Sequence, residues 1–246
     1  RFVMLATIRE FGLEQLAATG EADEAHRAHA LAMLALAERM ELAAHEPFGQ
    51  RAMATLDAEH DNLKAALTWA DAAGEPELCL RLAGALSAFW YARSHYRLGC
   101  FWLERALERH PDAPVIWCHF GRIRYPDRGP SYTAERVERL LKRFPNLYFD
   151  TSVATLREYY PPSNAFARVL YDRSNGTLRP EWKAVMEKYP WRFLCGLDMG
   201  SDRCSPGQFL NRVTGQRYLL GFLSPETREI VAWRAAWRLL FHEELP

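Results

Sequence analysis

The sequence predicts an α+β protein in which N-terminal antiparallel helical hairpins precede a partial (β/α) barrel with about three parallel strands. The first half repeats apolar residues at helical spacing. The second half contains short apolar runs that each end in a polar residue, as strands of such barrels do. Composition changes between the halves: residues 1–112 hold 25 alanines and 3 prolines, and the rest hold 9 and 11. We therefore expect two domains, helical at 1–112 and α/β at 113–246.

Charge changes at the same place. Residues 1–112 carry 11 Lys+Arg against 17 Asp+Glu, and the remaining residues carry 20 against 14. The whole chain has zero formal net charge, which gives no general support to nucleic-acid or membrane binding. The five cysteines are irregularly spaced and form no CxxC motif, which favours a reduced, cytoplasmic compartment. No apolar stretch reaches about 18 residues and no signal peptide is visible, so we expect no membrane span.

Five amphipathic helices are expected in the first half. The first starts at Leu5 and ends at Gly20, a residue that commonly terminates helices. The other four are expected at 29–42, 51–73, 77–91 and 96–108. Because the loops between them are short, consecutive helices should be antiparallel neighbours packed in pairs.

Three strands are expected in the second half, at 115–120, 147–151 and 193–198. They are apolar almost throughout, as parallel strands covered on both faces are. Helices are expected at 134–144, 180–189 and 224–241. Since parallel strands end at one edge of a sheet, His119 of the first strand and Asp198 of the last should converge there.

The sequence of the first half is similar to sequences of a known family. The segments MLATIREFGLEQLAATGE (4–21), AEHDNLKAALTWA (58–70) and LRLAGALSAFWYARSHYRLGCFWLERAL (80–107) resemble a region of bacterial ATPase regulators of the LuxR/AfsR type. They match the end of the winged-helix segment and the first tetratricopeptide-like hairpins. The resemblance implies a scaffold and partner-sensing surface at about 1–108. The family's P-loop and its DNA-reading helix-turn-helix do not occur in this sequence, so we expect no direct nucleic-acid binding.

The second half resembles a different family. VIWCHFG (115–121), RFPNLYFDTS (143–152), PEWKAVMEKYPWRFLCGLDMG (180–200) and LSPETREIVAWRAAWRLLF (223–241) resemble, in order, the last three strand–helix units of amidohydrolase-superfamily TIM barrels of the decarboxylase-like branch. The resemblance implies that His119 lies at the metal or substrate. It also implies that Asp198 binds a divalent metal, zinc or manganese, and handles the proton of the attacking water. An active protein would then be a metal-dependent hydrolase or decarboxylase.

The implied metal site is incomplete in the sequence. No HxH pair, which that family places on its first strand, occurs in the 246 residues. A catalytic zinc needs three protein ligands, and His119 and Asp198 supply two. Cys118 and Cys195 are either soft ligands or small buried apolar residues. Asp150 either supports the ligands or caps its strand.

Three hypotheses about function follow. The chain is an amidohydrolase-like remnant that is inactive alone, a helical interaction or regulatory module, or a join of two gene fragments with no selected function. The first predicts a small-molecule substrate only if the metal site is completed. The second predicts a protein partner bound through the helical half. Metal analysis of the purified chain separates the first from the other two.

Overall fold

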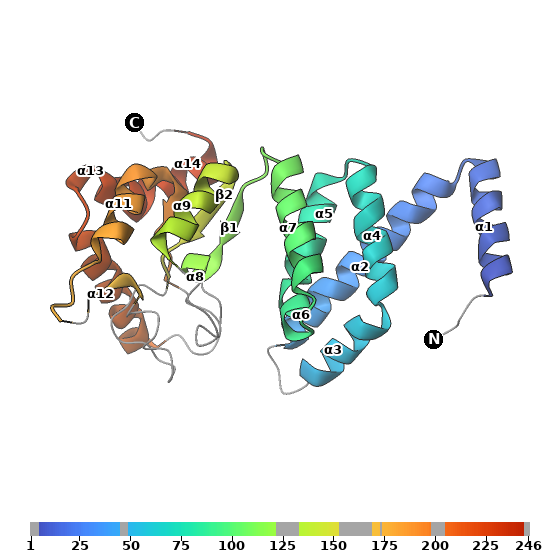
Figure 1. Cartoon of the computed structure of the whole chain (residues 1–246), viewed down its shortest axis with the longest axis horizontal. Coiled ribbons are helices and arrows are strands. Elements are labelled where there is room, and N and C mark those ends of the chain that lie inside the picture. Colours follow the sequence, from blue (N-terminus) through green and yellow to red (C-terminus); the bar gives the residue numbers. More distant parts are fainter. Residues whose placement is uncertain are drawn as a thin grey trace. The chain divides into compact units, whose positions relative to one another are not determined.

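The structure, a computed structural model, describes residues 5–44, 49–121, 133–152, 169–172, 174–197 and 205–243. The chain divides into two compact units, Arg1–Ala113 and Pro114–Pro246 (Figure 1). The first unit is helical wherever it is described, and the second contains a small parallel sheet among helices. The division lies beside the change in composition near residue 112.

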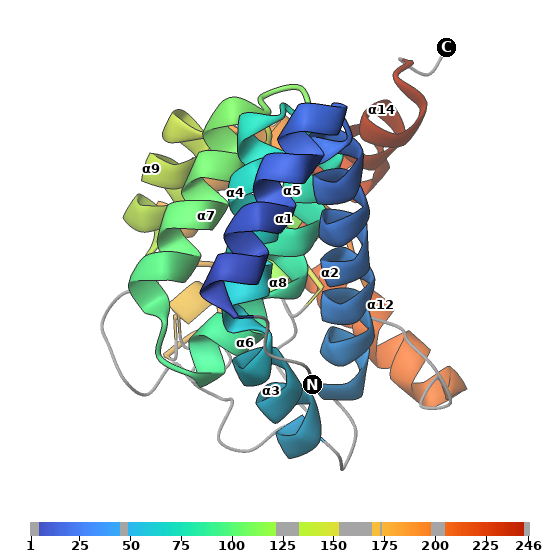
Figure 2. The same ribbon diagram turned by 90° about the vertical axis from the view of Figure 1, so that its right-hand side faces the viewer.

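The helical unit is built around the long helix α2, which packs against α3, α4 and α5, while α5 also packs against α7 (Figure 2). Its helices are α1 (Ala6–Thr19), α2 (Ala22–Ala44), α3 (Gly49–Ala58), α4 (His60–Ala72), α5 (Pro76–Ala85), α6 (Ser87–Ala92) and α7 (Tyr96–Arg109). Leucine and alanine side chains dominate the core, joined by Phe89, Trp90 and Trp102. Gly20 follows α1 with φ 75°, as expected for a glycine that ends a helix.

Two helices that we expected to be continuous are broken. The helix expected at 51–73 is divided into α3 and α4 at Glu59, and the one expected at 77–91 is divided into α5 and α6 at Leu86. Neither residue is a helix breaker, so local propensity does not mark either break. Helix propensity is a weak guide to such breaks, because tertiary contacts routinely override it.

The second unit alternates strands and helices. Its elements are β1 (Val115–Trp117), α8 (Cys118–Gly121), α9 (Ala134–Arg143), β2 (Leu147–Asp150), α11 (Pro180–Lys188), η2 (Pro190–Arg192), β3 (Phe193–Leu194), α12 (Pro206–Gly221), α13 (Pro225–Glu229), η4 (Ile230–Arg234, a π-helical turn) and α14 (Ala235–Phe241). The strands form one parallel sheet in the order β1-β2-β3. The expected parallel strands are therefore confirmed, but each is shorter than predicted, and the described residues form no barrel.

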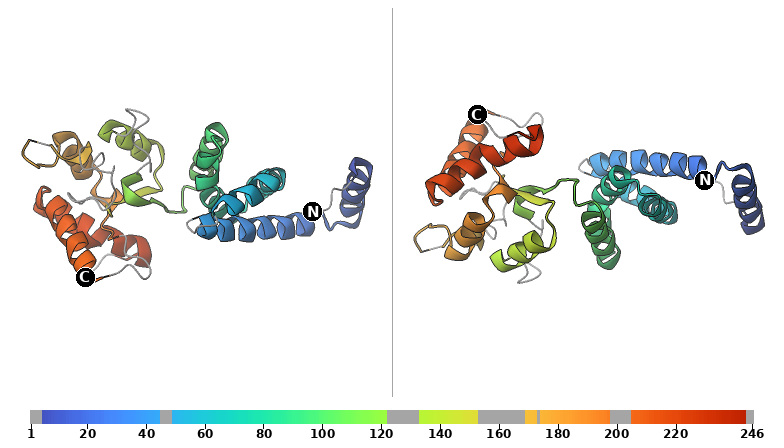
Figure 3. Two further views of the ribbon diagram at one scale, coloured as in Figure 1. Left: turned by 90° about the horizontal axis from the view of Figure 1, so that it is seen from below. Right: turned by 90° about the horizontal axis from the view of Figure 1, so that it is seen from above.

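Helices lie on both sides of this sheet (Figure 3). On one face the rings of Trp117, Phe149 and Phe193 form a row across the strands, with neighbouring centroids 5.9 and 6.1 Å apart. On the other face, Tyr148 and Leu194 pack with residues of η4 and α14. Coverage on both faces of β2 and β3 explains why these two strands are largely apolar, whereas β1 is more exposed.

The two edges of the sheet differ. At β3, the Cys195 N–H donates to the carbonyl of Val231 in η4 at 3.0 Å, so this edge is covered. At β1, the Val115 N–H donates to Asn146 of the neighbouring segment. The alternation of a parallel ladder then turns the backbone of Ile116 outward. The Ile116 and Trp117 side chains are 43% and 40% exposed.

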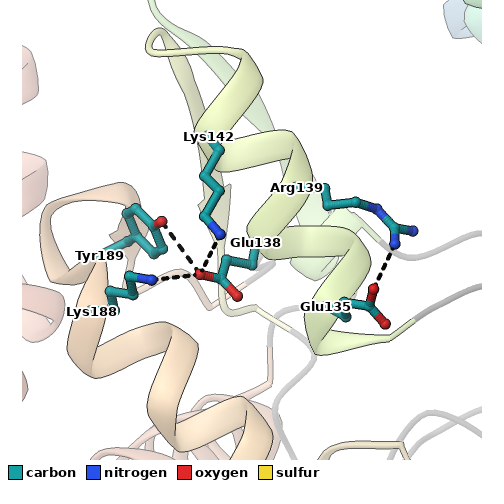
Figure 4. Close-up of polar contacts among 6 residues, drawn as sticks. All are labelled: Glu135, Glu138, Arg139, Lys142, Lys188 and Tyr189. Atoms are coloured by element: carbon teal, nitrogen blue, oxygen red, sulfur yellow. Dashed lines mark hydrogen bonds and ion pairs between the residues drawn. The ribbon is translucent and has the colours of Figure 1, made fainter.

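A carboxylate joins the two helices α9 and α11. Glu138 accepts hydrogen bonds from Lys188 at 2.8 Å and Tyr189 at 3.5 Å, and pairs with Lys142 at 3.1 Å (Figure 4). The bonds from Lys188 and then Lys142 lower the pKa of Glu138 to about 2. Since these groups face solvent, the cluster orients the helices and contributes little to stability.

Candidate functional site

Three side chains meet where β1 and β2 end. Asp150 Oδ1 accepts the backbone N–H of His119 at 2.8 Å, the backbone N–H of Ser152 at 3.0 Å and the Ser152 hydroxyl at 2.6 Å. The ring Nδ1 of His119 lies 2.9 Å from Ser152 Oγ. The last residue of β2 thus ties together the turns that follow both strands.

These bonds select one tautomer of His119. The single hydroxyl proton of Ser152 is donated to Asp150, so Ser152 Oγ can only accept from the imidazole. The imidazole Nδ1 therefore carries a proton, and in the neutral form of the ring the lone pair is on Nε2. A neutral histidine of this form is a metal ligand or a general base through Nε2.

The backbone at His119 adopts a conformation that residues other than glycine rarely adopt. His119 has φ 58° and ψ 41°, and Phe120 has φ 59° and ψ 24°. This left-handed turn corrects the prediction of a strand at 115–120, because the strand ends at Trp117. The reason is the side chain of Phe120, which is fully buried against Trp182 and Phe193. Such conformations cost of order 1–3 kcal/mol and cluster at functional sites.

A buried polar group lies next to this cluster. Gln216 of α12 accepts the Thr151 hydroxyl at 2.7 Å and donates to the Thr151 carbonyl at 2.5 Å. The Cys195 thiol lies 3.6 Å from the same Gln216 oxygen. Gly196 packs closely here, because a Cβ atom would lie 3.3 Å from the carboxyl carbon of Asp150. The two bonds to Gln216 fix the backbone at Thr151, directly after Asp150.

The structure describes some of the predicted site residues but not all of them. His119 lies at the carboxyl edge of the sheet, bonded as described above, whereas Asp198 lies outside the described residues. Their convergence therefore stays a prediction. Cys118 is exposed. Burial raises the pKa of the Cys195 thiol, which a Thr151 hydrogen bond opposes and the charge of Asp150 reinforces, so this group stays a protonated thiol.

The described donors do not fit a catalytic metal. Within the described ranges, no three His, Cys, Asp or Glu side chains are grouped so that they could hold a metal ion. Asp150 Oδ1 already accepts three hydrogen bonds, so Asp150 acts as a brace for the turns. A catalytic zinc needs three protein ligands, and the described cluster offers one imidazole beside a carboxylate occupied in this way.

Sequence reasoning missed Ser152, Gln216 and the helix α12 that carries Gln216. A signal for α12 was present in the sequence at 205–208. There Ser205 accepts the backbone N–H of Gln208 at 3.2 Å, and the Gln208 side chain accepts the backbone N–H of Ser205 at 3.1 Å. This capping box, with proline at the first helical position, marks the start of a helix. It would have placed Gln216 on a helix but would not have indicated its partner.

The helical unit contains a buried carboxylate bound by two arginines. Asp71 of α4 is 8% exposed and pairs with Arg105 at 2.7 Å and Arg109 at 2.9 Å, both on α7. Arg109 also donates to the Asp71 carbonyl at 3.0 Å. The network joins two helices that are distant in sequence and so fixes the position of α7 in the unit.

Comparisons with known proteins concern only part of the chain. No family model matches, and no solved structure matches significantly. Over 108 residues, 44% of the chain, it is 37% identical to proteins of Mycobacterium tuberculosis (strain H37Rv) and Mycobacterium bovis, each named "Putative HTH-type transcriptional regulator". The match spans 12% of the length of these curated relatives. The similarity is thus to a short portion of much larger proteins.

In the part of the chain that the structure describes, no helix combines the length and the apolar composition needed to cross a membrane.

Proposed function

We propose that the chain acts through its helical unit, as a protein-interaction or regulatory module of the kind found in LuxR/AfsR-type transcriptional regulators. The observation that carries the proposal is the 37% identity over 108 residues to proteins named as transcriptional regulators. The helical hairpins of the first unit support it, because such hairpins present rigid surfaces to partners. The absence of direct nucleic-acid binding stays a prediction, although the relatives are named HTH-type.

The surface of α7 has the composition of a binding surface. Phe101 is 53% exposed, and its ring lies 5.8 Å from the guanidinium carbon of Arg105. Aromatic residues and arginine are enriched at protein interfaces, where a few of them supply most of the binding energy. Because the buried Asp71 network holds Arg105, Phe101 lies on a pre-ordered helix.

A partner-capture experiment tests this proposal. The full chain is used as bait in a mycobacterial lysate, and bound proteins are quantified by mass spectrometry. We expect Phe101→Glu to remove at least one specific partner, because a buried charge would disfavour the interface. Phe209→Glu is the matched control, since Phe209 is 50% exposed on α12 of the other unit. Partners lost with Phe209→Glu but retained with Phe101→Glu would contradict the proposal.

A second candidate function rests on the cluster at the strand ends. We propose that His119 and Asp198 are what remains of an amidohydrolase-like metal site. The left-handed turn at His119 and its selected tautomer support this, because both are features of functional sites. No reaction step is assigned, since the described residues do not complete a metal site.

This second candidate predicts weak metal binding. After dialysis against a chelator, we expect well under one zinc or manganese ion per chain by plasma mass spectrometry, and no appreciable hydrolase activity. His242→Ala is the control, because His242 is exposed and follows α14. One tightly held metal ion per chain, lost on His119→Ala or Asp198→Ala but kept in His242→Ala, would overturn the prediction. It would show that ligands beyond the described residues finish the site.

A further inference from the structure

Helix α7 has one face that is clearly occupied within its own unit. Gly99, Trp102 and Ala106 are buried there. Gly99 allows close approach, because a Cβ atom would lie 3.2 Å from the Trp90 ring. With this inward face fixed, helical geometry determines which residues lie on the remaining sides.

A second apolar stripe lies on an adjoining side of α7. It consists of Tyr96, Cys100, Leu103 and Leu107, which recur at i, i+4, i+7 and i+11 and so follow one line along the helix. Tyr96 is 54% exposed, Leu103 is 36% exposed, and Cys100 is also exposed. None of the four side chains carries a charge at neutral pH. We call these four residues the α7 stripe.

In stacked helical hairpins, a stripe of this kind is normally covered by the next hairpin. Here the element that follows α7 along the chain is the strand β1, so the stack of hairpins does not continue from α7. We propose that a second copy of the chain covers the α7 stripe, with the two α7 helices antiparallel about a twofold axis. The proposal rests on the function proposed above and specifies the partner of one surface of that unit.

The spacing of the stripe favours a second copy. About an axis between Cys100 and Leu103, Tyr96 meets the partner's Leu107 and Cys100 meets the partner's Leu103. An antiparallel twofold pair therefore matches every position of the stripe with an apolar one.

Charge on the flanking side agrees with this arrangement. Arg97 and Glu108 lie on the same side of the stripe, and both are exposed. The twofold axis brings Arg97 of each copy opposite Glu108 of the other, so the interface contains two such pairs. Opposite charges are thus apposed at both ends of the interface, which a parallel arrangement would not achieve.

Sedimentation measures the expected association. Four side chains per copy form a small interface, so we expect a dimer with a dissociation constant on the order of micromolar or weaker. Leu103→Glu should weaken it by at least roughly tenfold, because it buries a charge in the stripe. Leu13→Glu is the control, since Leu13 is 39% exposed on α1. Circular dichroism verifies that both variants retain their helices.

Cross-linking tests the geometry. In the antiparallel pair, the two Cys100 residues are offset by three positions on helices 8–10 Å apart, which puts them roughly 10 Å from one another. A bismaleimide of that span should join two copies of the wild-type chain. The linked dimer should persist in Cys118→Ser and disappear in Cys100→Ser, since Cys118 is also exposed.

Several outcomes would overturn this inference. They are a monomer at the highest concentration measured, a dimer unaffected by Leu103→Glu, a cross-link through Cys118, or protection of Cys100 from alkylation in the monomer. The last would mean that the stripe is covered within one chain. Partner capture that depends on Phe101 would survive each of them, because Phe101 lies on a different side of α7 from the stripe.

Discussion

Replacing Trp182 by alanine should lower the free energy of unfolding of the α/β unit by about 3–5 kcal/mol. Trp182 of α11 is 1% exposed, and its ring packs edge-to-face on Phe120 with centroids 5.7 Å apart. Its removal leaves a large cavity among aromatic rings that cannot collapse together. Because single domains are stable by only about 5–15 kcal/mol, the loss would leave the unit close to unfolding.

Chemical denaturation of the full chain, followed by circular dichroism, measures this loss. The two units are expected to unfold in separable steps, so the step that changes identifies the unit. Trp233→Ala provides a matched control, because Trp233 is 41% exposed and its loss should cost well under half as much. Equal effects of the two substitutions would show that the aromatic core described here does not stabilise the unit.

Asp71→Asn should destabilise the helical unit by about 1–3 kcal/mol at neutral pH. The substitution removes the charge that pairs with Arg105 and Arg109 while nearly preserving volume. The cost stays below that of a fully buried pair, because the arginine side chains are 36% and 47% exposed and can be hydrated. The control is Asp57→Asn, which breaks a solvent-exposed pair with Arg93 and should cost about 0–1 kcal/mol.

The pairing of Asp71 with Arg105 and Arg109 also predicts how the stability of the helical unit depends on pH. Burial raises the pKa of Asp71, but hydrogen bonds and charges from Arg105 and Arg109 outweigh it, so the pKa lies below its ordinary value. The stabilisation is therefore complete above the unfolded pKa of about 3.9 and is lost as pH falls through the lower folded pKa. Below about pH 4, the free energy of unfolding of the wild type should no longer exceed that of Asp71→Asn. An advantage that is constant from pH 7 to pH 3 would contradict this.

Local patterns predicted the type of most elements but not their limits. The apolar periodicity of the first half predicted helices, and the three apolar runs of the second half predicted the three parallel strands. The breaks at Glu59 and Leu86 could not be predicted, because neither residue is a helix breaker. The helix expected at 224–241 begins as predicted, after the capping residue Ser224, but contains the π-helical turn η4. In that turn the Val231 carbonyl accepts the N–H of Cys195, just after β3, a contact that no local pattern contains.

The candidate site was predictable only at the level of which strand ends carry polar residues. His119 was expected at the edge of the sheet, and the structure places it there. Its bond to Ser152, the tautomer that this bond selects and the left-handed turn all follow from contacts between separate strands. The buried bonds between Thr151 and Gln216 span 65 positions of the sequence, beyond the reach of any local motif.

The covered edge at β3 limits how copies of this sheet can polymerise. A sheet that grows into a fibre needs unpaired backbone groups on both edge strands, because each added copy must pair with one edge and leave another edge open. In the described residues, the π-helical turn occupies the outward N–H of Cys195, so recruitment can proceed only from Ile116 on β1. In two copies joined through β1, the remaining edges are the two β3 edges, which are already covered. For the sheet that the described residues form, edge-to-edge growth therefore terminates at a pair instead of propagating into a filament.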